Sequence, residues 1–564
     1  MLGVARGLAI VFLLLFSSAG ASYARATSAT VGVYPAGTSF TASGPAPSGA
    51  GSSVSLAMPI GGVDDAVVLV RGAQNVALRA PTMQAPLTLS TRFAHYVSVG
   101  GAPVPDALLP WDGTQRAAEE PNQPVWLQVS VPQGTAPGVY SGSVDVLADG
   151  NTTAVPISVT VYPVTLPALN QVKGALLTAF NMNPQTYGNE VQKLYGIPAD
   201  QSLPGLFDFF SSYRLSPNNW GYGNPKSKSG YASSRKWWLD KSGQMISAVG
   251  SPRRFRSMWI PLSNNRWPKS AYVAGLSPYK PQTWCRYLKS VHGFWQKHGW
   301  LGAAFPYVYG LDESGAKLLS TVQRSAKTIH SCFAGGHLVI TGNPSSANRP
   351  LWNGGKDDAD VWSVLASRYY GEYTNPSQHT PRTAANLNLI DKVRKHGKQI
   401  WAYTYPSGAN QTPGYAATEP VSDPRMFVDW AALEGITGIL YGEGTTSYSL
   451  KTNPLSSLTH SGAFVLVYPG KDGPVPSARL EELREGIEDW AILDVVRQKH
   501  GAASVRKLLS GLFTTSAKGA VLACTIGCPL KSNTRYSWPL YSRDASTAGK
   551  IAQMRAQALA AAAS

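Results

Sequence analysis

Residues 303–313, AAFPYVYGLDE, are the stretch that decides the fold: a short apolar run of strand composition that ends in two acids, Asp312 and Glu313. Similar runs recur along the chain and alternate with amphipathic helical segments, which indicates parallel strands joined by crossover helices. The other runs are GALLTAF (174–180), SPNNW (216–220), RSMWIPL (256–262), HLVITGNP (337–344), DVWSVLASRYY (360–370), QIWAYTYPSG (399–408) and ITGILYGEG (436–444). Eight runs predict a (β/α)8 barrel over 168–450. A doubly wound open sheet would show a Gly-rich phosphate loop after its first strand, and the sequence has none there.

The barrel is flanked by two further regions. Alternating apolar residues in PVWLQVSVP (124–132) and VPISVTVYP (155–163) predict a β-sandwich over 56–167. Residues 451–564 are expected to form a strand and helix region that packs on the barrel. Within it, 477–501 predicts a long helix with Ser477 as its N-cap and Gly501 as its stop. The dense acids and arginines of that helix are expected to form ion pairs that hold it to the barrel, and the Ala-rich tail beyond Ser546 is expected to fray.

The N-terminus has the features of a secretory signal peptide over residues 1–24. Arg6 precedes an apolar run from Leu8 to Phe16, and small residues follow it. We therefore expect a secreted or periplasmic protein with no membrane span, although an uncleaved anchor is the alternative. Residues 25–55 are expected to form a flexible lead.

Four cysteines fit an oxidising compartment, and their pairing stays open: Cys524 and Cys528 are close enough to close a small loop, and Cys285 and Cys332 could form a second bridge.

The chain is basic, with 49 Lys and Arg residues, 32 Asp and Glu residues and a formal net charge of +17. Eight of these basic residues lie between Lys226 and Arg256, where Asp240 is the single acid. Such a balance favours encounter with polyanions. An exported protein without a nucleic-acid-binding motif points to an anionic polysaccharide or envelope rather than to nucleic acid. A basic solvated surface with no specific partner is the alternative.

Asp312 and Glu313 are the residues most suited to catalysis. Hydrolysis of a glycosidic bond needs one acid to protonate the leaving oxygen and a second group to stabilise the positive charge at the anomeric carbon. Adjacent acids cannot easily lie on opposite sides of a sugar ring, as ordinary two-carboxylate mechanisms require. They suit a mechanism in which a 2-acetamido group of the substrate attacks the anomeric carbon. The alternative is that both acids only cap the following helix.

Other strand-end residues are candidates for binding substrate. They are polar or aromatic, as sugar recognition requires, and each one taken alone could equally belong to the core. We expect Asn181, Trp220, Trp259, Tyr309, Asn343, Tyr370, Tyr403, Tyr405 and Glu443 in this role. The sequence has no metal-binding motif and no GxSxG motif, so neither a metal nor a cofactor is expected.

Three segments resemble glycoside hydrolase family 123 and its group of related barrel domains. PVWLQVSVPQGTAPGVYSGSVDV (124–146) resembles the end of their N-terminal sandwich, and YVYGLDESG (307–315) resembles their Asp-Glu motif. GAFVLVYPGKDGPVPSARLEELREGIEDWAIL (462–493) resembles their C-terminal signature and is the most specific of the three.

This resemblance implies a retaining hydrolase of β-linked N-acetylgalactosamine. Asp312 would hold the acetamido group and Glu313 would act as acid and base. Two features depart from the family pattern: Gly442-Glu443 stands where relatives often have an aromatic residue, and the basic segment is additional. Two alternatives stay open, a glycosidase acting on a non-acetamido or anionic bacterial polysaccharide, and a non-catalytic carbohydrate-binding envelope protein. The oligomeric state is not indicated.

Overall fold

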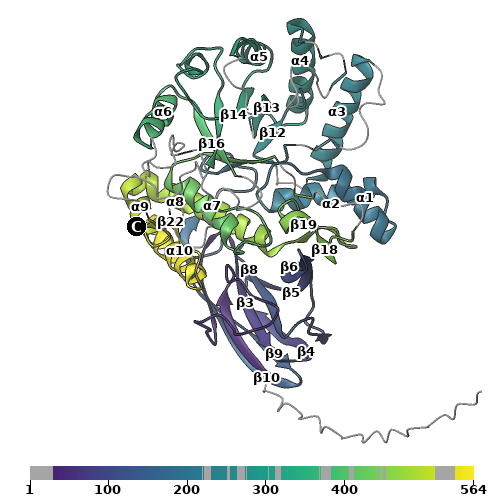
Figure 1. Ribbon diagram of the computed structural model, residues 1–564, viewed down its shortest axis with the longest axis vertical. Coiled ribbons are helices and arrows are strands. Elements are labelled where there is room, and N and C mark those ends of the chain that lie inside the picture. The colour runs from purple at the N-terminus through teal and green to yellow at the C-terminus, as the bar shows by residue number, and fades with distance from the viewer. Residues whose placement is uncertain are drawn as a thin grey trace, which may run out of the picture.

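The structure is a computed structural model of a sandwich joined to a parallel barrel (Figure 1). It describes residues 29–218, 220–221, 230–249, 255–262, 273–274, 276–277, 279–302, 304–311, 319–366, 369, 383–404, 412–442, 445–446, 448, 452–514 and 540–564. The expected signal peptide over 1–24 lies outside the described residues, as do Cys524 and Cys528. Among the described helices, none is both long enough and apolar enough to cross a membrane.

The sandwich consists of two sheets. The first has the order β1-β3-β8-β5-β18, with β6 also paired to β5, and the second has the order β2-β10-β9-β4-β7. The strands of the first are β1 (Thr30–Pro35), β3 (Val63–Arg71), β5 (Thr88–Val99), β6 (Ala102–Pro110), β8 (Asn122–Ser130) and β18 (Ser457–Leu458). Those of the second are β2 (Val54–Ile60), β4 (Asn75–Met83), β7 (Arg116–Ala117), β9 (Gly138–Ala148) and β10 (Asn151–Thr165). The alternating valines of β8 and β10 fill the space between the sheets, as their spacing predicts.

The boundaries of the sandwich differ from the expected ones at two places. Residues 30–35, within the expected flexible lead, form β1, which pairs antiparallel with β3 and buries Val33 and Tyr34. At the other end of the chain, β18 pairs parallel with the end of β5, so residues that follow the barrel complete a sandwich sheet. His95 on β5 strengthens this junction because its Nε2 lies 2.8 Å from the Leu455 carbonyl oxygen.

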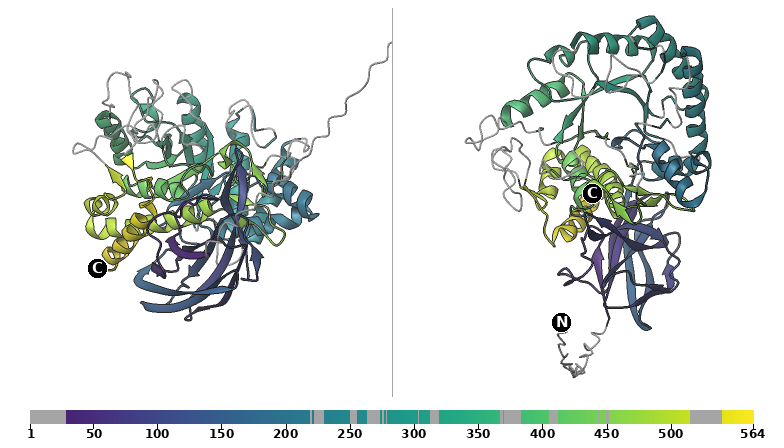
Figure 2. Two further views of the ribbon diagram at one scale, coloured as in Figure 1. Left: turned by 60° about the horizontal axis from the view of Figure 1, so that its bottom comes forward. Right: turned by 45° about the vertical axis from the view of Figure 1, so that its right-hand side comes forward.

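The barrel sheet is parallel throughout and has the order β11-β17-β16-β15-β14-β13-β12, seven strands within the described part of the chain. The strands are β11 (Leu177–Phe180), β12 (Ser257–Trp259), β13 (Phe305–Leu311), β14 (His337–Thr341), β15 (Val361–Leu365), β16 (Gln399–Tyr403) and β17 (Gly438–Tyr441). The helices that surround them are α1 (Pro184–Tyr195), α2 (Ala199–Ser212), α3 (Tyr231–Ala248), α4 (Pro281–Lys297), α5 (Leu319–Cys332), α6 (Thr383–Lys395) and α7 (Asp423–Leu433). Figure 2 shows them as an outer arc around the strands.

The expected (β/α)8 barrel therefore needs a correction at its second strand. Residues 216–218 lie extended between β11 and β12 but make only an isolated bridge, Phe180 to Pro217. The Phe180 N–H donates to the Ser216 carbonyl at 2.9 Å, and the Ser257 N–H on β12 donates to the Ser216 hydroxyl at 3.2 Å. Because proline has no N–H to donate, Pro217 prevents a regular ladder here. The barrel is nearly closed, with this segment in the place of a strand.

The C-terminal region packs at the junction of the two domains. It contains α8 (Ala478–His500), α9 (Ala502–Leu509), α10 (Thr547–Ala563) and the short strands β19 (Val467–Tyr468), β20 (Val475–Pro476), β21 (Phe513–Thr514) and β22 (Leu540–Tyr541). The predicted caps of α8 are confirmed: the Ser477 hydroxyl accepts a hydrogen bond from the Leu480 N–H at 3.1 Å, and Gly501 follows the helix with φ 82°. The expectation that the tail frays is wrong, because α10 buries Ile551, Met554 and Leu559.

Buried ion pairs hold α8 in place. Arg479 donates to both carboxylate oxygens of Asp106 on β6, at 2.8 and 2.7 Å. Arg484 lies 3.2 Å from Asp65 on β3. These arginines and aspartates are at least nine-tenths buried, so each pair joins α8 directly to the sandwich. The expectation that the charges of this helix are structural is confirmed.

Two neighbouring helices add further arginines to this network. Arg425 on α7 pairs with Glu485 and with Asp489, the latter at 2.7 Å. Arg555 on α10 lies 2.6 Å from Asp489 and 3.5 Å from Asp64 on β3. The sandwich, the barrel helix α7 and α10 therefore meet on one buried helix.

The acids of this network are not fully matched by cations. Among the described residues, neither carboxylate oxygen of Glu482 has a hydrogen-bond partner, although Arg425 lies 3.9 Å away. Burial raises the pKa of Glu482 to about 8. Burial, together with the nearby Glu481, raises the pKa of Asp65 to about 7. These two carboxyl groups therefore bind protons more tightly in the folded protein than in the unfolded chain.

Replacing Arg425 with methionine is expected to lower the free energy of unfolding by about 3 to 5 kcal/mol, because Glu485 and Asp489 would lose their shared buried cation. Denaturant unfolding measures the loss. Lys550→Ala is the matched control, since its partner Asp544 is exposed, and should cost less than about 1 kcal/mol. Equal stability of Arg425→Met and the wild type would contradict a structural role for the network.

The free energy of unfolding is also expected to depend on pH through Glu482 and Asp65. Because their folded pKa values lie above their unfolded ones, stability should fall as pH rises from about 4 to about 8. Glu482→Gln keeps a neutral side chain at every pH, so its stability should fall less over this window. Denaturant unfolding of both proteins at several pH values measures the difference, and parallel pH profiles would refute the assignment.

Candidate active site

The carboxyl ends of the barrel strands meet at one mouth, where a parallel barrel gathers its functional side chains. The interior below this mouth is filled by aromatic rings. Trp401 on β16 lies 5.8 Å from Tyr307 on β13 between ring centroids. The backbone of β17 makes room for it, because a Cβ atom at Gly438 would lie 2.5 Å from the Trp401 indole.

Two of the predicted substrate-binding residues lie nearer to the mouth than these rings. Tyr309 and Tyr403 follow Tyr307 and Trp401 by two positions on the same strands, and successive residues of a strand alternate between faces. Both tyrosines therefore belong to the inner face, nearer to the mouth, and both are only partly buried. The alternation thus places both Tyr309 and Tyr403 on the inner side of the barrel.

The strand that carries the acid pair has an irregular register. Tyr309 pairs with Val339 on β14, but Leu311 pairs with Ile340, so one extra residue, Gly310, lies in β13. Such a bulge exchanges the two faces of a strand beyond it and commonly re-aims a side chain next to an active site. Asp312 and Glu313 come directly after this bulge, and both lie outside the described residues.

Asn181, at the end of β11, connects two loops of the mouth. Its side-chain amide donates to the Gly442 carbonyl at 2.9 Å, and its own carbonyl accepts from the Thr445 N–H at 2.9 Å. The Thr446 hydroxyl donates to the Asn183 carbonyl at 3.0 Å. Asn181 therefore fixes the backbone on both sides of Glu443. Sequence reasoning missed Thr445 and Thr446, whose role depends on a contact between distant segments.

Asn343 follows β14 and is also partly buried. Its backbone carbonyl accepts a hydrogen bond from the Asn348 side chain at 3.0 Å, which closes the loop after the strand. The other predicted binding residues, Tyr370, Tyr405 and Glu443, lie outside the described residues.

Trp220 and Trp259 occupy the core instead of an open surface. Both are 1% exposed, and each packs edge-to-face on Trp238 of α3. The Trp220 indole N–H donates to the Trp259 carbonyl at 3.2 Å. This cluster closes the barrel wall next to the segment that replaces the second strand. A stacking role for these two rings stays a prediction.

Tyr307 is a buried polar group that the site predictions did not include. Within the described part of the chain its hydroxyl has no hydrogen-bond partner, and burial raises the pKa of Tyr307 well above its ordinary value. It therefore stays neutral in the barrel interior. The sequence feature that could have identified Tyr307 is its position in YVYG, two residues before Tyr309 and therefore on the same face of the strand.

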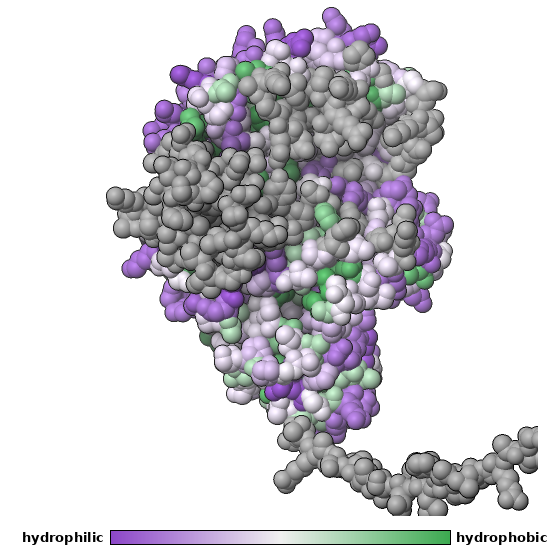
Figure 3. Space-filling view, viewed as in Figure 1, coloured by the Kyte–Doolittle hydropathy of each residue, from purple (hydrophilic) through white to green (hydrophobic). Residues whose placement is uncertain are grey.

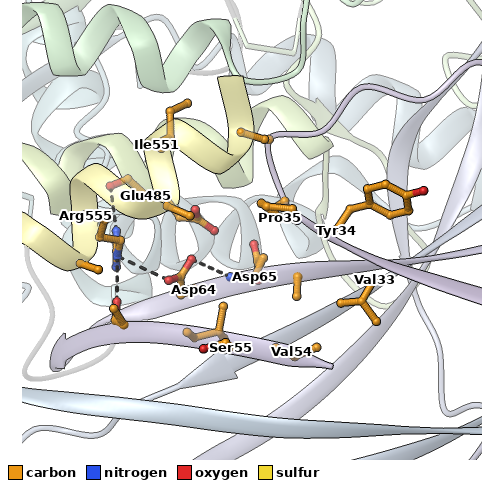
Figure 4. A pocket seen from close by; sticks show the side chains of 18 of the residues that line it. Val33, Tyr34, Pro35, Val54, Ser55, Asp64, Asp65, Glu485, Ile551 and Arg555 are labelled. Carbon is orange, nitrogen blue, oxygen red and sulfur yellow. Dashed lines mark hydrogen bonds and ion pairs between the residues drawn. The ribbon is translucent and has the colours of Figure 1, made fainter. Parts of the chain in front are cut away.

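The mouth is distinct from a cavity of about 430 Å³ at the domain junction (Figure 4). Asp64, Asp65, Glu485 and Arg555 line that cavity, and it includes none of the predicted site residues. Its acids belong to the α8 network. Across the described ranges, no group of three or more His, Cys, Asp or Glu side chains has a geometry suited to a metal ion.

Comparisons with known proteins agree with this architecture. The model of the glycoside hydrolase 123 catalytic domain matches residues 265–496, and that of the glycoside hydrolase 123 N-terminal domain matches residues 93–148. Together the two matches cover about half of the chain. No protein of curated function matches the sequence.

Among solved structures, a family 123 glycoside hydrolase from Clostridium perfringens, studied for glycolipid glycan hydrolysis, superposes with a TM-score of 0.65 at 14% identity. The match covers 95% of this chain and 98% of that one. A GH10 xylanase with a bacterial Ig-like domain from termite gut has a TM-score of 0.30 at 9% identity, over 77% and 99% of the two chains. An endo-β-1,4-mannanase from Thermotoga petrophila has a TM-score of 0.32 at 11% identity, over 57% and 78%.

The two family models match in the same order as the sandwich and the barrel, and the catalytic model extends from residue 265 over β13 to β17 and most of α8. The chain is therefore a glycoside hydrolase and belongs to glycoside hydrolase family 123.

Proposed function

We propose that this hydrolase cleaves a β-linked 2-acetamido sugar, of the N-acetylgalactosamine type, from a glycan and retains the anomeric configuration. Asp312 orients and stabilises the acetamido group while its oxygen attacks the anomeric carbon. Glu313 donates a proton to the leaving oxygen and later accepts one from the attacking water. The relative from Clostridium perfringens, studied for glycolipid glycan hydrolysis, supports a glycan as substrate.

The register of β13 is the observation that carries this proposal. Tyr309 pairs with Val339, whereas Leu311 pairs with Ile340, so one extra residue lies in β13 directly before the acid pair. Bulges of this kind commonly re-aim a side chain next to an active site.

The adjacency of the two acids supports participation by the substrate. Consecutive Cα atoms are about 3.8 Å apart, whereas a retaining pair that flanks the sugar has its carboxyl groups about 5 to 5.5 Å apart and an inverting pair about 6.5 to 9.5 Å. Two side chains that start from neighbouring Cα atoms cannot easily place their carboxyl groups on opposite sides of a sugar ring. A nucleophile carried by the substrate removes the need for a second protein carboxylate on the opposite side.

We also propose that the protein acts outside the cytoplasm. The disulfide between Cys285 on α4 and Cys332 on α5 supports this, because such bonds persist in oxidising compartments. It agrees with the signal peptide expected over 1–24.

Glu313→Gln is expected to lower kcat/KM by about 10²- to 10⁴-fold on an aryl 2-acetamido-β-galactoside with a poor leaving group, because the general acid is lost. The loss should be much smaller with a dinitrophenyl leaving group, which needs no proton. Asp312→Asn should impair both substrates to a similar degree.

Steady-state kinetics on the two substrates test these roles, with Asp391→Asn on exposed α6 as control. A thiazoline analogue of the cyclic intermediate should inhibit competitively. Full activity of Glu313→Gln would overturn the catalytic assignment. Hydrolysis that thiazolines do not inhibit would instead favour a substrate without an acetamido group.

Asn181→Ala is expected to lower kcat/KM about tenfold with little loss of thermal stability, because it removes the hydrogen bond that holds Gly442 next to Glu443. The same assay measures it. Asn189→Ala on exposed α1 is the control and should leave kcat/KM unchanged. Unaltered kinetics of Asn181→Ala would show that the loop needs no such support.

A further inference from the structure

A basic groove lies between α4 and α5 on the outer wall of the barrel. Its volume is about 790 Å³, and it includes none of the predicted site residues. Its charged lining consists of Arg286 and Lys289 from α4 and of Arg324 and Lys327 from α5, with no acid. Each pair has i, i+3 spacing, which places its two members on one face of their helix.

The four cations are available to a ligand. All four side chains are exposed, and within the described part of the chain none forms an ion pair. Arg286 lies over Tyr231 and Arg324 over Tyr279, at 5.8 and 5.9 Å from the ring centroids. The Arg324 Nε–H also donates to the Ser320 carbonyl of its own helix at 3.2 Å. Figure 3 shows hydrophilic side chains along the upper rim of the molecule, where Figure 1 places α4 and α5.

The walls of the groove are held at a fixed separation. The Cys285–Cys332 disulfide joins α4 to α5 with 5.1 Å between Cα atoms. The Tyr279 hydroxyl adds a second connection, since it donates to the Arg324 carbonyl at 2.9 Å. The two cationic faces are therefore preorganised, which reduces the entropy lost when a ligand binds.

We propose that this groove binds an anionic glycan through its sulfate, phosphate or carboxylate groups and holds the enzyme on a charged polysaccharide. Arginine and lysine side chains in pairs suit successive oxyanion groups along a chain. The net charge of +17 would draw such a polymer to the protein. The choice of a glycan rests on the glycoside hydrolase assignment and not on the identity of the sugar that the active site cleaves.

Two other polyanions fit this site less well. Single-stranded nucleic acid usually stacks its bases on open aromatic faces, whereas Tyr279 is covered by Arg324 and packed against Trp284. Peripheral membrane binding usually inserts apolar side chains, and Val139 on the sandwich is the single large apolar residue that is strongly exposed among those described.

The test compares binding of the full chain to dextran sulfate, polygalacturonate and uncharged dextran. The groove variant carries Arg286→Gln, Lys289→Gln, Arg324→Gln and Lys327→Gln together. We expect it to bind at least one of the anionic polymers at least tenfold more weakly than the wild type, with a shallower salt dependence. Hydrolysis of a small uncharged aryl glycoside should be unchanged, and uncharged dextran should bind neither protein.

The matched control removes four positive charges elsewhere, through Lys392→Gln, Lys395→Gln, Arg506→Gln and Lys507→Gln on α6 and α9. It should weaken binding less than about threefold. Equal losses in both variants would show diffuse attraction and overturn the site. Tighter binding of an oligonucleotide or of phosphatidylserine vesicles, lost in the groove variant, would overturn the glycan as ligand.

Variants with only the α4 pair or only the α5 pair replaced should each show a partial loss of binding to the anionic polymer. They keep the test decisive if the variant with four substitutions is unstable.

Discussion

The burial of α8 with its charges is the constraint on which the rest of the structure depends. A helix this polar can leave water only if each ion finds a partner, because an unpaired buried charge costs several kcal/mol. The partners come from separate parts of the chain: Asp65 and Asp106 from the sandwich, Arg425 from the barrel and Arg555 from the last helix. Apolar contacts tolerate small displacements, but such ion pairs require one arrangement. The network therefore fixes how the two domains lie against each other, and it fixes the β17 side of the barrel that α7 covers.

The mouth of the barrel is built on this frame by contacts of a different kind. Trp401 fills the interior where Gly438 leaves room, and Tyr309 and Tyr403 lie above it. Hydrogen bonds such as that from Asn181 to Gly442 join one strand end to the next. A packed interior with joined strand ends is a suitable support for the two acids that we propose act on the same sugar. The bulge in β13 lies in the strand directly before them.

Much of this organisation follows from local sequence. Seven strands, the caps of α8 and the structural role of its charges were predictable, because alternation, capping residues and helical spacing are local signals. One failure is local, because Pro217 stands inside SPNNW and argues against a regular strand there. The others depend on contacts between distant residues: β1 gains its partner from β3, and the Ala-rich α10 is ordered because Arg555 and its apolar residues have a place to dock. The packing of Trp220 and Trp259 on Trp238 also depends on distant residues, and the role of the two rings in sugar binding stays a prediction.

The pairing of β18 with β5 has a consequence for how this architecture can evolve. Residues 457–458, encoded after the whole barrel, form the edge of a sheet whose other strands are encoded before it. Gene fusion or exon-like exchange at the linker near Pro167 would therefore separate a sheet from its own edge and Asp65 from Arg484. The sandwich is not a module that can be transferred between enzymes. It has to be inherited, and to diverge, together with the barrel.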